Sequence, residues 1–134
     1  MNSVRVTAIA CLMPLSELDE DPFLVDDRGQ HDMCKQWAAA RDYHLTCQLS
    51  LHHLRADHSA LWRDVAAGLV DVFVAPNRRA LENAIDGTAE FTARCAEAGV
   101  RLETTDLDEP VYTLAMKSQV HRRLSMPTAG YNGC

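Results

Sequence analysis

The sequence predicts an α/β fold: a three-layer sandwich whose central sheet has four mostly parallel strands, followed by a C-terminal helix. Three observations predict it. Four short apolar segments alternate with stretches of helical periodicity, the connections between them are short, and 134 residues with 47% hydrophobic side chains suit one domain. We place the domain at residues 4–125 and expect a flexible tail at residues 126–134, which contain a proline and two glycines.

The first half of the chain supplies two strands and one helix. Residues 4–13 are nearly all small or β-branched apolar side chains, which predicts a strand covered on both faces. Residues 14–29 are rich in acidic side chains and contain two prolines and a glycine, which predicts a long loop. Apolar side chains then recur at helical spacing over residues 30–42. Residues 43–50 alternate between apolar and polar side chains and predict the second strand.

The third strand lies between two predicted helices. Asp57 or Ser59 is expected to cap the helix before it, and Gly68 is expected to end that helix. Residues 70–75 form a short, mostly apolar run, which is typical of a buried parallel strand. Pro76 closes this strand because proline has no N–H to donate to a neighbour.

The last part of the chain repeats the helix–strand order. A helical stretch is expected at about residues 79–98, with a break at Gly87 and an end at Gly99. Residues 100–105 predict the fourth strand. After an acidic turn, residues 111–125 predict the final helix.

Composition excludes several classes of function. A net charge of −6 argues against a protein whose whole surface binds nucleic acid, because such surfaces are basic. No apolar run reaches the about 18 residues of a membrane-spanning helix, so we expect no membrane association. Five scattered cysteines without a CxxC pair favour reduced thiols and a cytoplasmic location. We expect no cofactor.

Three segments, in their order and spacing, resemble the catalytic domain of the serine recombinases, the resolvase and invertase family. Residues 37–43 read Trp-Ala-Ala-Ala-Arg-Asp-Tyr, and residues 96–102 read Ala-Glu-Ala-Gly-Val-Arg-Leu. Residues 67–74, Ala-Gly-Leu-Val-Asp-Val-Phe-Val, are the most similar local stretch. The resemblance implies a resolvase-like fold over most of residues 4–125.

The departures from the family gather at its chemistry. In the family, the first strand ends in a Tyr-x-Arg-x-Ser motif whose serine attacks a DNA phosphate. Here Cys11 stands at the arginine position and Met13 at the serine position. A thioether has no proton to lose and cannot be activated as a hydroxyl can. The resemblance therefore implies a degenerate member of the family that lacks the nucleophile.

The arginines that clamp the phosphate in the family are also reduced. The family's Asp-Arg-Leu-x-Arg motif is matched only with a one-residue gap, which keeps Arg79, and in either frame the last arginine is missing. Arg55 stands where a further active-site arginine is expected. Arg55, Arg78 and Arg79 are the candidates for weak contact with an anion or with DNA, and the alternative interpretation is a set of solvated surface side chains.

Two functions of different classes follow. The first is a catalytically inactive recombinase-like domain that acts through protein–protein contact, as a homodimer or as a regulator of a DNA-processing or recombination partner. Its interface is predicted on the final helix, at Val111, Leu114, Ala115 and Ser118. The alternative is a small-ligand-binding or enzymatic α/β domain with a pocket at the carboxyl ends of the strands, near residues 13–16, 51–55, 76–79 and 105–108.

Other candidate groups have simpler interpretations. Ser16 follows the first strand and is either a shifted nucleophile or, as we favour, an exposed loop serine. Cys47, His52, His53 and His58 are metal-ligating residue types, but they lack the spacing of a zinc motif. We interpret the histidines as exposed loop side chains and expect no metal site.

Overall fold

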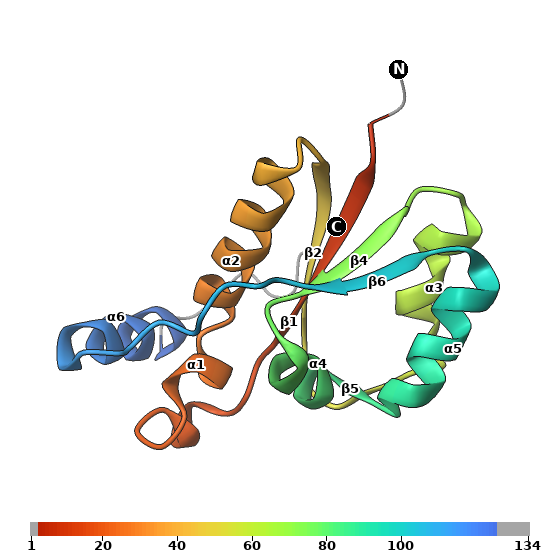
Figure 1. Cartoon of the computed structure of the whole chain (residues 1–134). Helices are drawn as coiled ribbons and strands as arrows, with labels where there is room; N and C mark the ends of the chain where they lie inside the picture. Colours follow the sequence, from red (N-terminus) through yellow and green to blue (C-terminus); the bar gives the residue numbers. More distant parts are fainter. Residues whose placement is uncertain (1–2, 126–134) are drawn as a thin grey trace.

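The computed structural model describes residues 3–125, and the predicted tail at 126–134 lies outside the described residues. A four-stranded sheet runs in the order β2-β1-β4-β6, and every neighbouring pair is parallel (Figure 1). The predicted four-stranded sheet is therefore confirmed. Its strands are β1 (Arg5–Cys11), β2 (His44–Leu51), β4 (Val72–Ala75) and β6 (Arg101–Thr104).

Helices cover both faces of this sheet, which confirms the three layers. Figure 1 shows α2 on one face and α3, α4 and α5 on the other. The helical elements are η1 (Leu15–Glu17), α1 (Pro22–Val25), α2 (Asp27–Ala40), α3 (Ser59–Ala66), α4 (Arg78–Ala84), α5 (Thr88–Ala98) and α6 (Leu114–Ser125).

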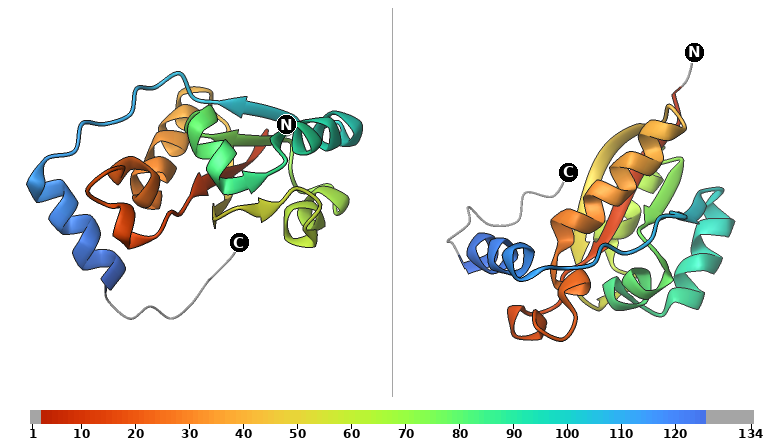
Figure 2. Two further views of the ribbon diagram at one scale, coloured as in Figure 1. Left: turned by 90° about the horizontal axis from the view of Figure 1, so that it is seen from below. Right: turned by 60° about the vertical axis from the view of Figure 1, so that its left-hand side comes forward.

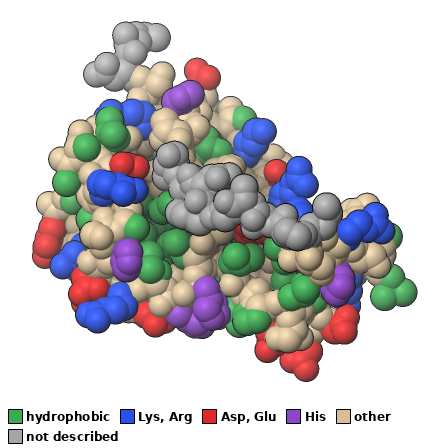
Figure 3. Space-filling model, turned by 180° about the vertical axis from the view of Figure 1, so that it is seen from behind, with side chains coloured by type: hydrophobic (Ala, Val, Ile, Leu, Met, Phe, Trp, Pro, Cys, Tyr) green, Lys and Arg blue, Asp and Glu red, His purple; other side chains and the backbone are tan. Residues whose placement is uncertain are grey.

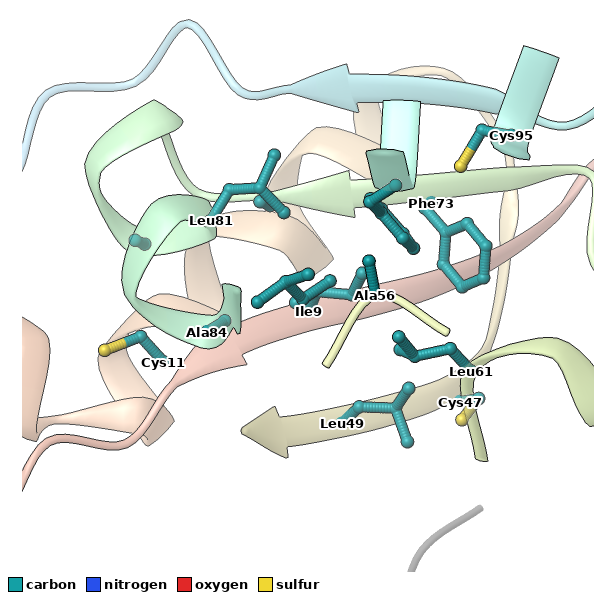
Figure 4. Packing of buried hydrophobic residues seen from close by; sticks show 14 of the residues in the cluster. Ile9, Cys11, Cys47, Leu49, Ala56, Leu61, Phe73, Leu81, Ala84 and Cys95 are labelled. Carbon is teal, nitrogen blue, oxygen red and sulfur yellow. The ribbon is translucent and has the colours of Figure 1, made fainter. Parts of the chain in front are cut away.

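The apolar run of β1 is explained by its central place. Val6 and Ala8 pack with Trp37 of α2 in one cluster of buried side chains. Ile9 and Cys11 belong to the cluster on the opposite face, against the side of α3, α4 and α5 (Figure 4). Successive side chains of a strand point to opposite faces, so both sets must be apolar.

Residues 14–29 are not the loop that their prolines and charges predicted. They contain η1, α1 and the start of α2, which begins at Asp27 rather than at Gln30. Pro22 occupies the first position of α1, where a missing N–H costs nothing. The short helix is held by tertiary packing, because three of its side chains are buried: Phe23, Leu24 and Val25.

The ends of the helices follow the predicted glycines more closely than the predicted caps. Gly87 separates α4 from α5, and Gly99 closes α5 in the left-handed conformation, at φ 72°. The N-cap of α3 is His58, whose ring nitrogen accepts the N–H two residues on. The predicted cap at Asp57 or Ser59 is therefore wrong by one residue.

A second, two-stranded parallel sheet was not predicted. It pairs β3 (Leu54–Arg55) with β5 (Ile85–Asp86), and β5 interrupts the stretch at 79–98 that was predicted as helical. Ile85 is fully buried in the main core, so burial rather than local propensity determines this break.

The last helix lies outside the three layers. After β6 the chain crosses without helix or strand to α6, and both views of Figure 2 show α6 apart from the sheet. The helix begins at Leu114 rather than at Val111. Within residues 3–125, no helix is long and apolar enough to cross a membrane.

The cysteines are only partly as predicted. Cys11, Cys34 and Cys95 are free and buried. Cys47 is disulfide-bonded, so the prediction of reduced thiols throughout is wrong at this position.

Candidate functional site

The carboxyl end of β1 is closed by a buried glutamine. The Gln30 side chain accepts the N–H of Cys11 at 2.7 Å and donates to the carbonyls of Cys11 and Phe23, at 3.0 and 2.8 Å. The Cys11 thiol donates to the Leu24 carbonyl at 3.3 Å. Burial raises the pKa of Cys11 to about 12. The thiol is therefore protonated at neutral pH and is not a nucleophile.

Met13 is a packing residue. Its N–H donates to the Leu24 carbonyl at 2.9 Å, and its half-buried side chain packs against two of the hydrophobic clusters. Ser16, the nearest hydroxyl along the chain, is exposed in η1. The end of β1 therefore presents an apolar side chain where the resemblance would require a nucleophile.

Arg79 is the centre of a polar cluster at the carboxyl end of β4. Its Nε and Nη2 donate to the two carboxylate oxygens of Glu109, at 3.1 and 2.6 Å, and its Nη1 donates to Asp21. Asn77 donates from Nδ2 to Glu109 at 2.8 Å. The guanidinium also lies 5.7 Å from the centre of the Phe23 ring.

This arrangement stabilises the charged form of the arginine. The hydrogen bonds that Arg79 donates to Glu109 first, and then to Asp21, raise the pKa of Arg79 above its ordinary value. Two parallel N–H···O bonds between a guanidinium and a carboxylate are the strongest geometry available to such a pair. The predicted anion contact at Arg79 is thus occupied by carboxylates of the same chain.

The other two candidate arginines lie apart from this cluster. Arg55 is exposed in β3 and pairs with Asp57 at 3.0 Å. Arg78 is exposed in α4 and pairs with Glu82 at 3.8 Å. Within residues 3–125, no hydrogen bond or shared carboxylate joins Arg55, Arg78 and Arg79.

A hollow of about 480 Å³ lies between the N-terminal part of α2 and α6, away from the strand ends where the alternative function placed a pocket. The carboxyl end of β4 is instead filled by the contacts of Arg79. The hollow is lined by Asp26, Arg28, Gly29, Asp32, Tyr112, Met116, Gln119, Val120, Arg122 and Arg123.

Hydrogen bonds among residues that line this hollow hold α6 in place. The Asp26 carboxylate accepts hydrogen bonds from the Tyr112 hydroxyl at 2.6 Å, from Arg123 at 2.8 Å and from the Gly29 N–H at 3.2 Å. Arg123 also donates to Asp27 at 3.1 Å. Burial, and then the bond to Asp26, raises the pKa of Tyr112 above its ordinary value. Tyr112 therefore stays protonated and acts as a donor.

A serine, a histidine and an aspartate meet beside this network, but not in catalytic order. The Ser50 hydroxyl donates to Asp27 at 2.7 Å, and the Nε2 of His31 lies 3.0 Å from the hydroxyl oxygen of Ser50. In a catalytic triad the histidine lies between the serine and the carboxylate and takes the serine proton. Here the proton is committed to Asp27, so the arrangement positions side chains and does not activate Ser50.

The four predicted interface residues lie on the outward face of α6 and of the turn before it. Val111 is 88% exposed and Leu114 is 83% exposed, and Ala115 and Ser118 are exposed as well. The opposite face of α6 packs through Val120, which is buried with side chains of η1 and α1. Val111 and Leu114 therefore remain exposed although α6 packs on its own domain through Val120.

The histidines do not form a metal centre. Cys47 is buried in β2, while His52, His53 and His58 are exposed beyond the end of that strand. His53 pairs with Asp86 at 3.0 Å. In the described part of the chain, no group of three or more His, Cys, Asp or Glu side chains could hold a metal ion.

Several residues of the site were not predicted from the sequence. Glu109 and Asp21 stand in acidic segments with no motif around them, and only the fold brings them to Arg79. Gln30 had a weak signal, since it is a polar residue on the buried side of a predicted helix.

The fold is similar to that of the C-terminal catalytic domain of ISC1926 TnpA, an IS607-like serine recombinase. The TM-score is 0.61 and the sequence identity 19%, over 91% of this chain and 80% of the other. No family model and no curated protein matches the sequence. The chain therefore has a serine-recombinase-like α/β fold.

Proposed function

We propose that this chain is a recombinase-like domain that does not cleave DNA and that acts through contact with a protein, which is a second copy of itself or a DNA-processing partner. One observation carries the proposal. Arg79, the arginine that the resemblance retains from the phosphate clamp, is bound to Glu109 and Asp21 of its own chain.

The chemistry of phosphoryl transfer explains why this matters. The reaction needs a positioned nucleophile and cations that stabilise the charge of the transition state. Here Met13 packs in apolar surroundings, and the Cys11 thiol stays protonated. Arg79, which the resemblance places in the phosphate clamp, is already paired with the carboxylates of Glu109 and Asp21. Each of the two requirements is unmet, so cleavage is not expected.

We also propose that contact with DNA is weak, because the candidate arginines are paired with carboxylates. Arg55, Arg78 and Arg79 each have a carboxylate partner, and the net charge is −6. Figure 3 shows acidic and basic side chains interspersed over one face of the molecule. A DNA-binding surface gathers positive charge instead.

The proposed contact surface is the outward face of α6, with Val111, Leu114, Ala115 and Ser118. Exposed apolar side chains that neighbour one another on a helix mark surfaces that bind partners. Val111 and Leu114 are the two most exposed large hydrophobic side chains among the described residues. We favour a second copy as the partner.

Two measurements test this proposal. The mass in solution, by light scattering after size exclusion, is expected to be that of a dimer that Leu114→Glu dissociates. Leu69→Glu is the matched control, since Leu69 is also an exposed leucine but lies before β4, away from α6. A dimer that both variants leave intact would show that α6 is not part of the interface. A monomer at high concentration would rule out the homodimer.

The second measurement is incubation with supercoiled DNA, followed by denaturation and a search for a covalent protein–DNA adduct. None is expected for the native chain or for Met13→Ser, because a restored hydroxyl would still lack a free Arg79. An adduct with the native chain would overturn the proposal. An adduct with Met13→Ser alone would show that Glu109 and Asp21 do not block the site.

A further inference from the structure

A continuous series of hydrogen bonds joins the buried His31 to α6. The Nε2 of His31 lies 3.0 Å from the hydroxyl oxygen of Ser50, and that hydroxyl donates to Oδ2 of Asp27 at 2.7 Å. The other carboxylate oxygen of Asp27, Oδ1, accepts a hydrogen bond from Arg123 of α6 at 3.1 Å. We propose that His31 controls the docking of α6, which stays packed on its domain while His31 is neutral and is released when His31 takes up a proton.

The donors and acceptors fix the form of His31 in this series. Ser50 has one hydroxyl proton, and it donates that proton to Asp27. The Ser50 oxygen therefore accepts a hydrogen bond from His31, so Nε2 carries the hydrogen and Nδ1 holds a lone pair. The Nδ1 atom is buried and has no hydrogen-bond partner. The docked arrangement is thus that of a neutral His31.

A proton on Nδ1 does not suit these surroundings. It would place a charged N–H group at a buried atom without an acceptor, and such a group loses its hydration without compensation. Burial accordingly lowers the pKa of His31 below its ordinary value, although the negative charges of Asp27 and Asp32 oppose the shift. A protonated ring gains an acceptor only by drawing Asp27 toward itself or by turning toward water.

Each of these movements weakens the attachment of α6. Asp27 cannot approach the imidazolium ring and also keep its full contact with Arg123. If the ring turns toward water instead, Ser50 loses the hydrogen bond that positions its hydroxyl against Asp27. In both cases a second cation competes with Arg123 for the negative charge of Asp27. The release of α6 and the protonation of His31 therefore favour each other.

His31 has few titratable neighbours on the elements that pack against α2. The charged groups that act on it, Asp27 and Asp32, lie on its own helix. Neither β4 nor α1 contains a titratable side chain. On β1 and β2, Arg5 and His44 lie together at the opposite end of the strands from Ser50, the Cys11 thiol bonds the Leu24 carbonyl, and Cys47 is disulfide-bonded.

The attachment of α6 rests on few contacts. The helix lies outside the three layers (Figure 2), and Val120 is the one buried residue among Leu114–Ser125. Arg123 joins it to Asp26 and Asp27. Segments with few buried contacts open at small free-energy cost. Weakening the contact with Asp27 therefore shifts α6 toward release and leaves the sheet folded.

The test is amide hydrogen exchange of the full chain at pH 7.5 and pH 5.0, read by mass spectrometry and corrected for the intrinsic effect of pH on exchange. The amides of α6 are expected to lose protection about fivefold or more at pH 5.0, because the released state binds the proton more tightly. The amides of α5, on the other face of the sheet from α2, should keep their protection (Figure 1). No loss in α6, or an equal loss in α5, overturns the inference.

Three variants tie the response to the series of hydrogen bonds. His31→Gln should abolish the pH response of α6, because glutamine does not titrate. His121→Gln is the matched control and should keep the response, since His121 is an exposed histidine on α6 itself. Arg123→Met should raise exchange of α6 at both pH values and remove the difference between them.

The outcomes of these variants decide the inference. A pH response that persists in His31→Gln, or one that disappears in His121→Gln, overturns it. Circular dichroism checks that each variant is folded. If His31→Gln does not fold, Arg123→Met decides in its place, and a response that persists in this variant overturns the inference.

This inference rests on the proposed function in one respect, since the released helix carries the proposed contact surface. The exchange is therefore repeated with Leu114→Glu, which is expected not to form the proposed dimer. A pH response of α6 in this variant, together with a native chain that is monomeric, would support control by His31 and rule out the homodimer. An α6 that does not respond to pH in a dimeric chain would rule out control by His31 alone.

Discussion

Arg123, near the end of α6, forms an ion pair of 2.8 Å with Asp26, the N-cap residue of α2. The pair joins two helices that are far apart in the sequence. Asp26 is the more buried of the two, with 13% of its side chain exposed. The contact places a cation near a carboxylate that already caps a helix, so one residue both ends the α1–α2 turn and anchors α6.

Removing this anchor should loosen α6. We expect Arg123→Met to lower the free energy of unfolding by about 1.5–3 kcal/mol, the usual worth of hydrogen bonds to charged groups. Arg122→Met is the matched control, because Arg122 is the exposed neighbour on the same helix. Urea denaturation measures both variants. Equal effects of the two changes would show that the ion pair adds nothing specific.

Gly29 is required by the close approach of two side chains. A Cβ at this position would lie 2.5 Å from a carboxylate oxygen of Asp26 and 3.0 Å from the Tyr112 hydroxyl. We expect Gly29→Ala to destabilise the protein by about 1–3 kcal/mol, although alanine favours a helix by about 1 kcal/mol over glycine. Gln36→Ala, at an exposed position of α2, is the control.

The cause of the Gly29 effect can be separated from general strain. In a Tyr112→Phe background the hydroxyl is absent, so Gly29→Ala should cost less than in the native chain. A double-mutant cycle from urea unfolding gives the coupling energy. A coupling of zero would place the strain elsewhere than at Tyr112.

Stability should fall when His31 is protonated. This side chain is buried, its Nδ1 has no hydrogen-bond partner, and burial lowers its pKa below the ordinary value of 6.5, against the opposing charges of Asp27 and Asp32. The unfolded state therefore binds a proton at a higher pH than the folded state. The stability that neutral His31 contributes is complete above pH 6.5 and is lost as the pH falls below it.

The measurement is urea unfolding at pH 7.5 and pH 5.5. The native chain should lose more stability between these values than His31→Gln does, because glutamine does not titrate. His44→Gln, at an exposed position of β2, should follow the native chain. If His31→Gln loses as much stability as the native chain, the acid sensitivity comes from other groups.

The Cys11 thiol should resist alkylation in the folded protein. With a pKa of about 12, only roughly one molecule in ten thousand carries the thiolate at pH 8, and the side chain is fully buried. Iodoacetamide labelling at pH 8, read by peptide mass spectrometry, should modify Cys11 quickly in urea and very slowly without it. Comparable rates in both conditions would contradict the buried thiol.

The sheet and its covering helices were predictable because they rest on local periodicity. The run from Val6 to Cys11 is apolar at every position but Thr7, as a strand covered on both faces requires. Gly87 and Gly99 mark helix boundaries because they adopt positive φ values that other residues avoid. Such features depend on a residue and its near neighbours.

Residues 14–29 show where local reading fails. Their prolines and acids are typical of a loop, yet Phe23, Leu24 and Val25 are buried and form α1. Burial against α2 and α6 outweighs the weak helix propensity of so short a segment. The second sheet escaped prediction for a similar reason, since two-residue strands carry no period to detect.

The amino-acid sequence by itself determined the four strands of the central sheet and most of the helices that cover it, the absence of a hydroxyl at position 13, and the presence of arginines at positions 55, 78 and 79. Only the tertiary structure decided what those arginines contact. Arg79 meets Glu109 and Asp21 from two distant segments, whereas Arg55 and Arg78 lie apart. The physical reason is that periodicity is a property of neighbouring residues, while charge pairing depends on distances of a few ångströms that only chain folding creates.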